Sequence, residues 1–201
     1  MKVYGDSISG NCYKIQLVCA LLDIPYTWVP LNILKGEAQA PEFLEKTPNG
    51  KIPLLVLGDG RCLSESNAIV NFLAAGSALL PEDAFLLAKT QQWQFFEQYS
   101  HEPYIAVRRF IQLYQGLPET RKAEYESKKA GSEKALKVME QQLAHTAFLV
   151  SDSPTVADIS LFAYTHRAHE AGLTLTHYPN IQRWINSIEK LPNFRPMRPK
   201  G

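Results

Sequence analysis

The chain has 201 residues, enough for one large domain or two small ones, and 45% of them are hydrophobic, which is ordinary for a protein with a buried core. Lys and Arg number 21 and Asp and Glu number 20, so the formal charge of +1 favours neither nucleic acid nor an anionic membrane as a partner. The three cysteines, Cys12, Cys19 and Cys62, have no paired spacing, so we expect no disulfide framework and a cytoplasmic location.

The first 76 residues alternate between short β-forming runs and amphipathic helices. A strand at Val3-Tyr4 opens the chain without the long apolar run of a signal peptide, and no later segment is long and apolar enough for a membrane span. From Asn11 the apolar residues follow the spacing of one helix face: Ile15, Val18, Cys19 and Leu22. The further elements predicted in this region are a strand at 26–29, a helix at 41–46, strands at 53–57 and 61–63, and a helix with Ser64 as its N-cap.

The pattern breaks at 76–81, which we interpret as a linker, and everything after Glu82 is predicted to be helical. A long helix with a bend near Pro103 comes first, and the helices that follow are predicted at 119–145, from Thr155 onward, and at 180–191. Thr155 and Asp158 have the spacing of a capping box, so we predict that Thr155 caps its helix and that Asp158 bonds back to the Thr155 amide.

The turn Ser9-Gly10-Asn11-Cys12 joins the first strand to the first helix. A helix N-terminus presents unpaired N–H groups and a partial positive charge, which favour anions, including thiolates. A hydroxyl at such a place can donate to a bound thiolate, but Ser, Gly and Asn are also ordinary N-cap residues. The four residues by themselves favour the capping role.

Two more places have the polar groups of a binding site. A cis Ile52-Pro53 bond would turn the Ile52 backbone outward to pair with an extended peptide, although a trans proline at a strand start explains the pair as well. The start of the next helix offers free N–H groups and the Ser66 hydroxyl to a carboxylate, and Glu65 to an ammonium group. The alternative is an acidic first turn that only complements the helix dipole.

Other chemistries find little support in the sequence. His166 and His169 lie three residues apart beside Glu170, but no Cys or third His is near them in sequence, so we expect an exposed helix face and no metal. The sequence contains no G-x-S-x-G nucleophile elbow, no G-x-G-x-x-G dinucleotide motif and no P-loop.

Together these segments resemble the cytosolic glutathione transferase family, in its serine-type or bacterial-type classes, over nearly the whole chain. The most specific matches are Asn49-Gly50-Lys51-Ile52-Pro53 and Ser64-Glu65-Ser66-Asn67-Ala68-Ile69, with Ala157-Asp158-Ile159 downstream. The resemblance implies a fold that is α/β plus all-α. A thioredoxin-like βαβαββα domain at 1–76 would bind glutathione, and an all-helical domain would occupy 83–201. It also implies a homodimer.

The resemblance further implies a role for each part of the glutathione site. Ile52-Pro53 would form the cis-Pro loop that pairs with the cysteinyl part, and Glu65 and Ser66 would hold the γ-glutamyl end. The residues implied near the glycyl carboxylate are Lys35, Gln39 and Lys51. The electrophile would lie between Ile8 and the long helix. The residues expected to line its pocket on the helical side are Tyr104, Arg108 and Tyr164.

Two residues compete to activate the glutathione thiol. Ser9 falls at the position of the activating hydroxyl in serine-type classes, and Asn11 falls where some bacterial members place an activating amide, although Asn11 could instead cap the helix. We favour Ser9. A tyrosine mechanism is set aside because Tyr4 comes too early, within the first strand, and Cys12 lacks the partner that a dithiol cycle needs.

The expected reaction is attack of the glutathione thiolate on a small hydrophobic electrophile, with glutathione as co-substrate and no metal. A free thiol has a pKa of about 8.5, and each unit by which a site lowers it reflects about 1.4 kcal/mol of thiolate stabilisation. Hydrogen-bond donors supply that stabilisation without a general-base histidine. The alternatives are a glutathione-dependent disulfide reductase or peroxidase that uses the same pocket, and a non-catalytic relative that serves as a binding or scaffold protein.

Overall fold

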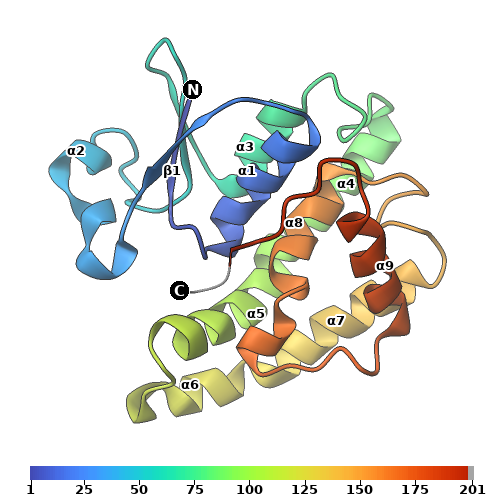
Figure 1. Ribbon diagram of the computed structural model, residues 1–201. Coiled ribbons are helices and arrows are strands. Elements are labelled where there is room, and N and C mark those ends of the chain that lie inside the picture. The colour runs from blue at the N-terminus through green and yellow to red at the C-terminus, as the bar shows by residue number, and fades with distance from the viewer. Residues whose placement is uncertain (199–201) are drawn as a thin grey trace. The chain divides into compact units, whose positions relative to one another are not determined.

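A computed structural model describes residues 1–198 and divides into two compact units (Figure 1). The first unit combines residues 1–77 with residues 191–198, and the second is Ala78–Lys190. The first contains a four-stranded mixed sheet with helices, and the elements of the second are all helical. The prediction of an α/β region followed by an all-helical region is therefore confirmed.

The sheet of the first unit has the strand order β2-β1-β3-β4. Its strands are β1 (Lys2–Gly5), β2 (Thr27–Pro30), β3 (Leu54–Val56) and β4 (Cys62–Ser64). Strand β1 is parallel to β2 and antiparallel to β3, and β3 is antiparallel to β4, so β1 and β4 point the same way. Each of these two strands leads into a helix, α1 (Gly10–Leu21) or α3 (Ser66–Ala74). Both helices therefore begin at the same edge of the sheet.

Helices α1 and α3 pack side by side (Figure 1). Although the sequence suggested a single apolar stripe, α1 is buried continuously from Cys12 to Cys19. A side chain at Gly5 would place its Cβ 2.6 Å from the Cys12 sulfur, so the end of β1 meets α1 without room for a larger residue. A further α-helix of this unit, α2 (Pro41–Leu44), starts with proline at its first position as expected.

Residues 191–198, which we expected in the helical region, group with the first unit. The Tyr13 hydroxyl on α1 donates a hydrogen bond of 2.7 Å to the backbone carbonyl of Arg195. Met197 is 3% exposed, so this segment contributes an apolar side chain to a core as well as a polar contact. The first unit is thus assembled from both ends of the chain.

The helices of the second unit are α4 (Ala84–Phe96), α5 (Glu102–Arg109), α6 (Lys122–Ser127), α7 (Lys129–Leu143), α8 (Val156–Thr165) and α9 (Pro179–Glu189). A π-helical turn, Glu97–His101, interrupts the long helix just before Pro103. Proline lacks an N–H to donate to the preceding turn, so the predicted bend has a direct backbone cause.

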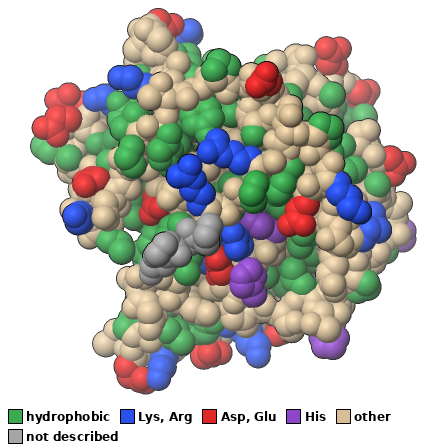
Figure 2. All heavy atoms as spheres, in the orientation of Figure 1, with side chains coloured by type: hydrophobic (Ala, Val, Ile, Leu, Met, Phe, Trp, Pro, Cys, Tyr) green, Lys and Arg blue, Asp and Glu red, His purple; other side chains and the backbone are tan. Residues whose placement is uncertain are grey.

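The visible surface carries charges of both signs. Lys and Arg are interspersed with Asp and Glu over the face in Figure 2, in keeping with the formal charge of +1. None of the helices formed by residues 1–198 is long and apolar enough to cross a lipid bilayer.

The carboxylate of Asp158 joins three segments of the second unit. It accepts from the Thr155 amide at 2.8 Å, which completes the predicted capping box of α8. It also accepts from the Leu149 amide and from the Trp184 indole of α9, both at 2.9 Å. Because Asp158 is fully buried, every one of these donors would lose its partner, away from water, if the carboxylate were removed.

We therefore predict that Asp158→Ala lowers the free energy of unfolding by about 3 kcal/mol or more, because each buried donor left without a partner costs about 1–3 kcal/mol. Urea denaturation measures this loss. Asp152→Ala is the matched control, because Asp152 accepts from the Ala147 amide at an exposed site and should contribute less than about 1 kcal/mol. Equal losses in the two variants would contradict the central role of Asp158.

Candidate functional site

Three segments meet at the sheet edge where α1 and α3 begin. In the strand register Leu54, the first residue of β3, lies between Tyr4 of β1 and Ser64 of β4. The turn after β1, the Ile52-Pro53 pair before β3 and the residues after β4 therefore lie at one edge. These are the three segments that the sequence singled out for chemistry.

The peptide bond between Ile52 and Pro53 is cis, as the resemblance implied and contrary to the simpler trans interpretation. Pro53 is buried and Ile52 is partly exposed. Because Leu54 follows at once and pairs with both neighbouring strands, the sheet fixes this loop from its C-terminal side.

The start of α3 differs from the expected cap. Ser64, predicted as the N-cap, is the last residue of β4 and pairs with Leu54. Its backbone is therefore held in the sheet and is not at the cap position. Glu65 takes the cap position with φ of 66°, and its exposed side chain makes no capping bond. A non-glycine residue in this conformation is strained by about 1–3 kcal/mol, and such strain is concentrated at ligand-binding segments.

A chain of polar contacts connects the first turns of the two helices. The Ser66 hydroxyl lies 3.2 Å from the Asn11 amide oxygen, to which it donates. The Lys14 ammonium, fully buried on α1, donates to the Ser66 hydroxyl oxygen at 3.1 Å and to the Asn67 amide oxygen at 3.4 Å. Sequence reasoning missed Lys14 as a site residue. The available signal was a charged residue within an apolar helix, one turn after Asn11.

Ser9, the other residue expected near the thiol, is the N-cap of α1. Its backbone is extended, and its hydroxyl oxygen accepts from the Cys12 amide at 3.4 Å. A hydroxyl that accepts a bond keeps its own proton for donation, so capping leaves Ser9 able to act as a donor. Because Ser9 holds the cap, the alternative in which Asn11 caps the helix does not occur here, and the Asn11 oxygen faces Ser66 instead.

The two buried thiols of the first unit, Cys12 and Cys19, are poorly suited to nucleophilic chemistry. Burial raises the pKa of Cys12 to about 12, although hydrogen bonds with the Ser9 side chain and the Asp6 backbone act to lower it. Burial likewise raises the pKa of Cys19 to about 12. Both side chains are therefore neutral thiols at neutral pH, and Cys62 is an exposed cysteine on β4.

The residues expected near a glycyl carboxylate are all exposed. The Gln39 amide donates to the Gly50 carbonyl at 3.0 Å, which links its turn to the segment that contains Lys51. Gly50 has φ of 59°, and a Cβ there would lie 2.5 Å from the Gln39 amide nitrogen, so this link requires glycine. Lys35 ends the preceding turn, Ile33–Lys35.

Of the residues expected around the electrophile, Ile8 belongs to the first unit, and Tyr104, Arg108 and Tyr164 belong to the second. Arg108 is buried and donates to the Ala171 carbonyl at 2.9 Å. Its guanidinium also lies 3.6 Å from the centre of the Tyr125 ring. Tyr164 is buried. The Tyr104 ring packs against Gly131, where an added Cβ would come within 2.2 Å of the ring. Arg108 thus has a clear packing function in its own unit.

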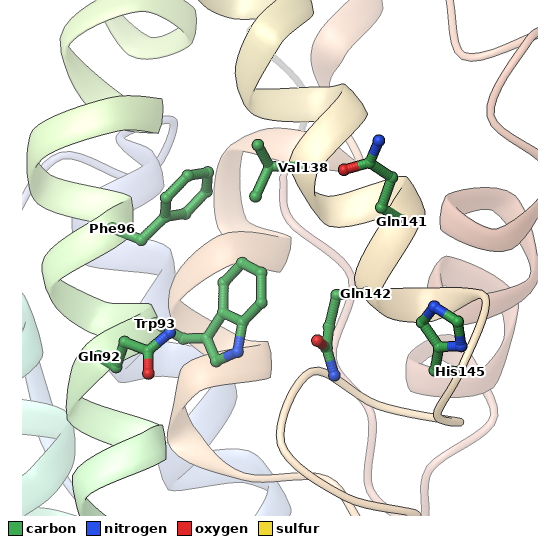
Figure 3. Close-up of a pocket in the computed structure, with 7 residues that line it drawn as sticks. All are labelled: Gln92, Trp93, Phe96, Val138, Gln141, Gln142 and His145. Carbon is green, nitrogen blue, oxygen red and sulfur yellow. The ribbon is translucent and has the colours of Figure 1, made fainter.

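The second unit also contains a cavity of about 340 Å³ between α4 and α7 (Figure 3). Trp93 and Phe96 of α4 face Val138 of α7 across it, and three amide side chains and one histidine complete its lining: Gln92, Gln141, Gln142 and His145. None of the residues expected around the electrophile lines this cavity.

His166, one of the two histidines considered as metal ligands, is a packing residue. Its ring stacks on Phe162 at 4.3 Å and its Nδ1 donates to the Phe162 carbonyl at 2.6 Å. Burial lowers the pKa of His166 to about 3. Within residues 1–198, no three His, Cys, Asp or Glu side chains are grouped as metal ligands would be.

Comparison with known proteins assigns both units to one family. Residues 8–75 match the family model for the glutathione S-transferase N-terminal domain, and residues 85–192 match the model for its C-terminal domain. Glutathione S-transferase 3 of Zea mays is 29% identical, with 97% of this chain and 91% of the relative aligned.

Solved structures are also similar to the chain. A glutathione S-transferase from Pseudomonas fluorescens Pf-5 is 57% identical with a TM-score of 0.96 and 98% coverage of both chains. A maleylacetoacetate isomerase from Methylobacterium extorquens AM1, solved with malonate and glutathione bound, is 25% identical with a TM-score of 0.81 and full coverage of both chains. With family matches in both units and a close structural relative along nearly its whole length, the chain belongs to the glutathione S-transferase family and is a glutathione transferase enzyme with a thioredoxin-like N-terminal fold.

Proposed function

We propose that the chain joins the glutathione thiolate to a small hydrophobic electrophile, with the tripeptide held at the sheet edge where α1 and α3 begin. The observation that carries this proposal is the meeting of two helix N-termini and the cis Ile52-Pro53 bond at that edge. Helix N-termini favour anions, and glutathione offers carboxylates and an ionisable thiol to them.

The γ-glutamyl end is assigned to the start of α3. The Ser66 hydroxyl and the first free N–H groups of the helix suit its carboxylate, and the exposed Glu65 carboxylate suits its ammonium group. The strained backbone of Glu65 supports this assignment, because the strain turns the side chain out of the ordinary helix-capping arrangement.

The cysteinyl part is assigned to the Ile52-Pro53 loop, where an extended peptide pairs as an added strand does. The glycyl carboxylate is assigned to the exposed segment of Gln39 and Lys51, with Lys35 on the turn before it. The bond between Gln39 and the Gly50 carbonyl supports this grouping, because it joins the Gln39 side chain to the residue just before Lys51.

The thiol is assigned to the start of α1. We propose Ser9 as the donor that stabilises the thiolate, because its capping bond leaves its proton available. Asn11 is the competing donor. Its amide oxygen accepts from Ser66, so a hydrogen bond to the thiolate would come from its NH₂ group. Within the first unit, Ile8 is the residue proposed to contact the electrophile.

The function and the choice of donor are tested together by conjugation of an aryl halide with wild type, Ser9→Ala and Asn11→Ala. Loss of the activating donor should raise the pKa of bound glutathione by about one unit, which leaves up to about tenfold less thiolate at neutral pH. The kcat/KM should fall by the same factor and recover at higher pH, where the thiol ionises without help. The ultraviolet absorbance of the bound thiolate, followed against pH, measures the pKa directly.

A shift in Ser9→Ala alone supports our assignment, and a shift in Asn11→Ala alone transfers the activating function to Asn11. Melting temperatures accompany both variants, because removal of the Ser9 cap costs about 1 kcal/mol of stability. If wild type is retained on immobilised glutathione but forms no conjugate, the disulfide reductase or peroxidase alternative replaces conjugation. If it is not retained at all, a scaffold role is favoured.

Ser66 should control affinity and leave the chemical step unchanged. Ser66→Ala removes a donor to the γ-glutamyl carboxylate, a charge-assisted bond of about 1.5–3 kcal/mol, so the KM for glutathione should rise roughly 10- to 100-fold. The kcat should change little, because the contact is made equally in the ground and transition states. Steady-state kinetics with Ser64→Ala as the neighbouring control tests this, and a normal KM in Ser66→Ala would place the γ-glutamyl site elsewhere.

We also propose that the chain is cytoplasmic and forms a homodimer through the surfaces of α3 and α4. Large apolar side chains are unusually exposed on these helices and the turn after α4: Phe72, Phe85 and Phe95, and Tyr99 at 86% exposure. Free cysteines, two of them buried, support a reducing compartment.

Light scattering at micromolar concentration should give close to twice the 22.7 kDa mass of one chain. Phe95→Lys should shift the mass to that of one chain, because a charge on the apolar contact would be buried against its symmetry mate. Glu126→Lys, an exposed charge change on α6, is the control and should leave the mass unchanged. A single-chain mass for wild type would exclude a stable dimer.

A further inference from the structure

The buried ammonium of Lys14 is the feature of the first unit that the family comparison leaves unexplained. Its side chain is fully buried, and its Nζ lies 3.1 Å from the Ser66 hydroxyl and 3.4 Å from the Asn67 amide oxygen. A buried charge is destabilising unless polar groups surround it, and an apolar side chain of similar length would pack two helices at least as well. A requirement other than helix packing is therefore expected at this position.

The hydrogen-bond roles in the cluster follow from the chemistry of its members. Lysine donates only, an amide oxygen accepts only, and a serine hydroxyl has a single proton. Ser66 therefore accepts from Lys14 and gives its one proton to the Asn11 oxygen, 3.2 Å away. The proton proposed to bind the γ-glutamyl carboxylate is therefore donated to Asn11 in this structure.

We infer that Lys14 is a positioning residue that acts through Ser66 to strengthen binding of the γ-glutamyl carboxylate and to couple that binding to Asn11. The inference rests on the proposed function. Lys14 holds the Ser66 oxygen in place, and its charge makes the hydroxyl a stronger donor in a site of low dielectric constant. When the γ-glutamyl carboxylate binds, the Ser66 hydroxyl donates to it instead of to the Asn11 oxygen. Binding of the γ-glutamyl end therefore changes the hydrogen bonding of Asn11, the side chain proposed to lie beside the thiol.

A double-mutant cycle on glutathione affinity tests the coupling. Calorimetric titration of wild type, Lys14→Met, Ser66→Ala and the double variant gives four dissociation constants. We expect Lys14→Met to weaken binding about tenfold in wild type and less than about twofold when Ser66 is already alanine, since Lys14 acts through that hydroxyl. Equal factors in both backgrounds would show that Lys14 acts independently of Ser66 and would overturn the inference.

A second ligand separates positioning from general structural support. Glutathione with its glutamyl α-carboxylate amidated lacks the negative charge that the proposal requires. Lys14→Met should change the affinity for this analogue by less than about twofold, whereas a loosened helix α1 would weaken both ligands alike. Equal weakening of the two ligands would therefore reject the positioning role.

The matched control is Gln16→Met, which makes another buried polar residue of α1 apolar and should leave glutathione affinity unchanged. If Lys14→Met does not fold, as judged by circular dichroism, Lys14→Gln removes the charge with a polar side chain and enters the same cycle. If Ser66→Ala binds glutathione normally, the proposed γ-glutamyl site fails and the inference fails with it. If Ser66→Ala is weakened but both Lys14 variants bind like wild type, only the inference about Lys14 is wrong.

Discussion

The common direction of β1 and β4 is the constraint on which the arrangement of the first unit depends. These strands are not neighbours, but β3 lies between them antiparallel to both, so their ends point to one edge of the sheet. Two helix N-termini and the entrance to β3 must then share that edge. The partial positive charges of the helices add where an anion would bind, and no long loop is needed to bring the segments together.

The parts of the fold that the sequence predicted are those set by local spacing. The capping box at Thr155 and Asp158 depends on residues three apart, and the helix break before Pro103 depends on a missing N–H, so both could be recognised from short segments. The cap of α3 was misplaced because Ser64 has the right chemistry for a cap but is held in the sheet by Leu54. Cap preference is a local property, whereas strand register is decided by a distant part of the chain.

The same distinction between local and distant contacts explains which residues of the candidate site could be proposed from the sequence. Ser9, Ile52-Pro53 and Glu65-Ser66 could be proposed from sequence because each lies at the start of an element, where unpaired backbone groups favour binding. Lys14 lies inside a helix, and the role we propose for it depends on its contact with Ser66, 52 residues further along the chain. Conversely, Arg108 has a promising charge in the sequence, but its guanidinium is occupied by the Ala171 and Tyr125 carbonyls.

The contact between Tyr13 and the Arg195 carbonyl has a consequence for how the protein is made. Tyr13 is synthesised before the second unit and Arg195 after it, so the two partners are separated by the entire helical unit along the chain. During synthesis, the helical unit can therefore complete its own contacts while the sheet unit still lacks residues that close its core, such as Met197. The sheet unit, although most of it precedes the helical unit in sequence, reaches its final form only after residues 191–198 have been synthesised.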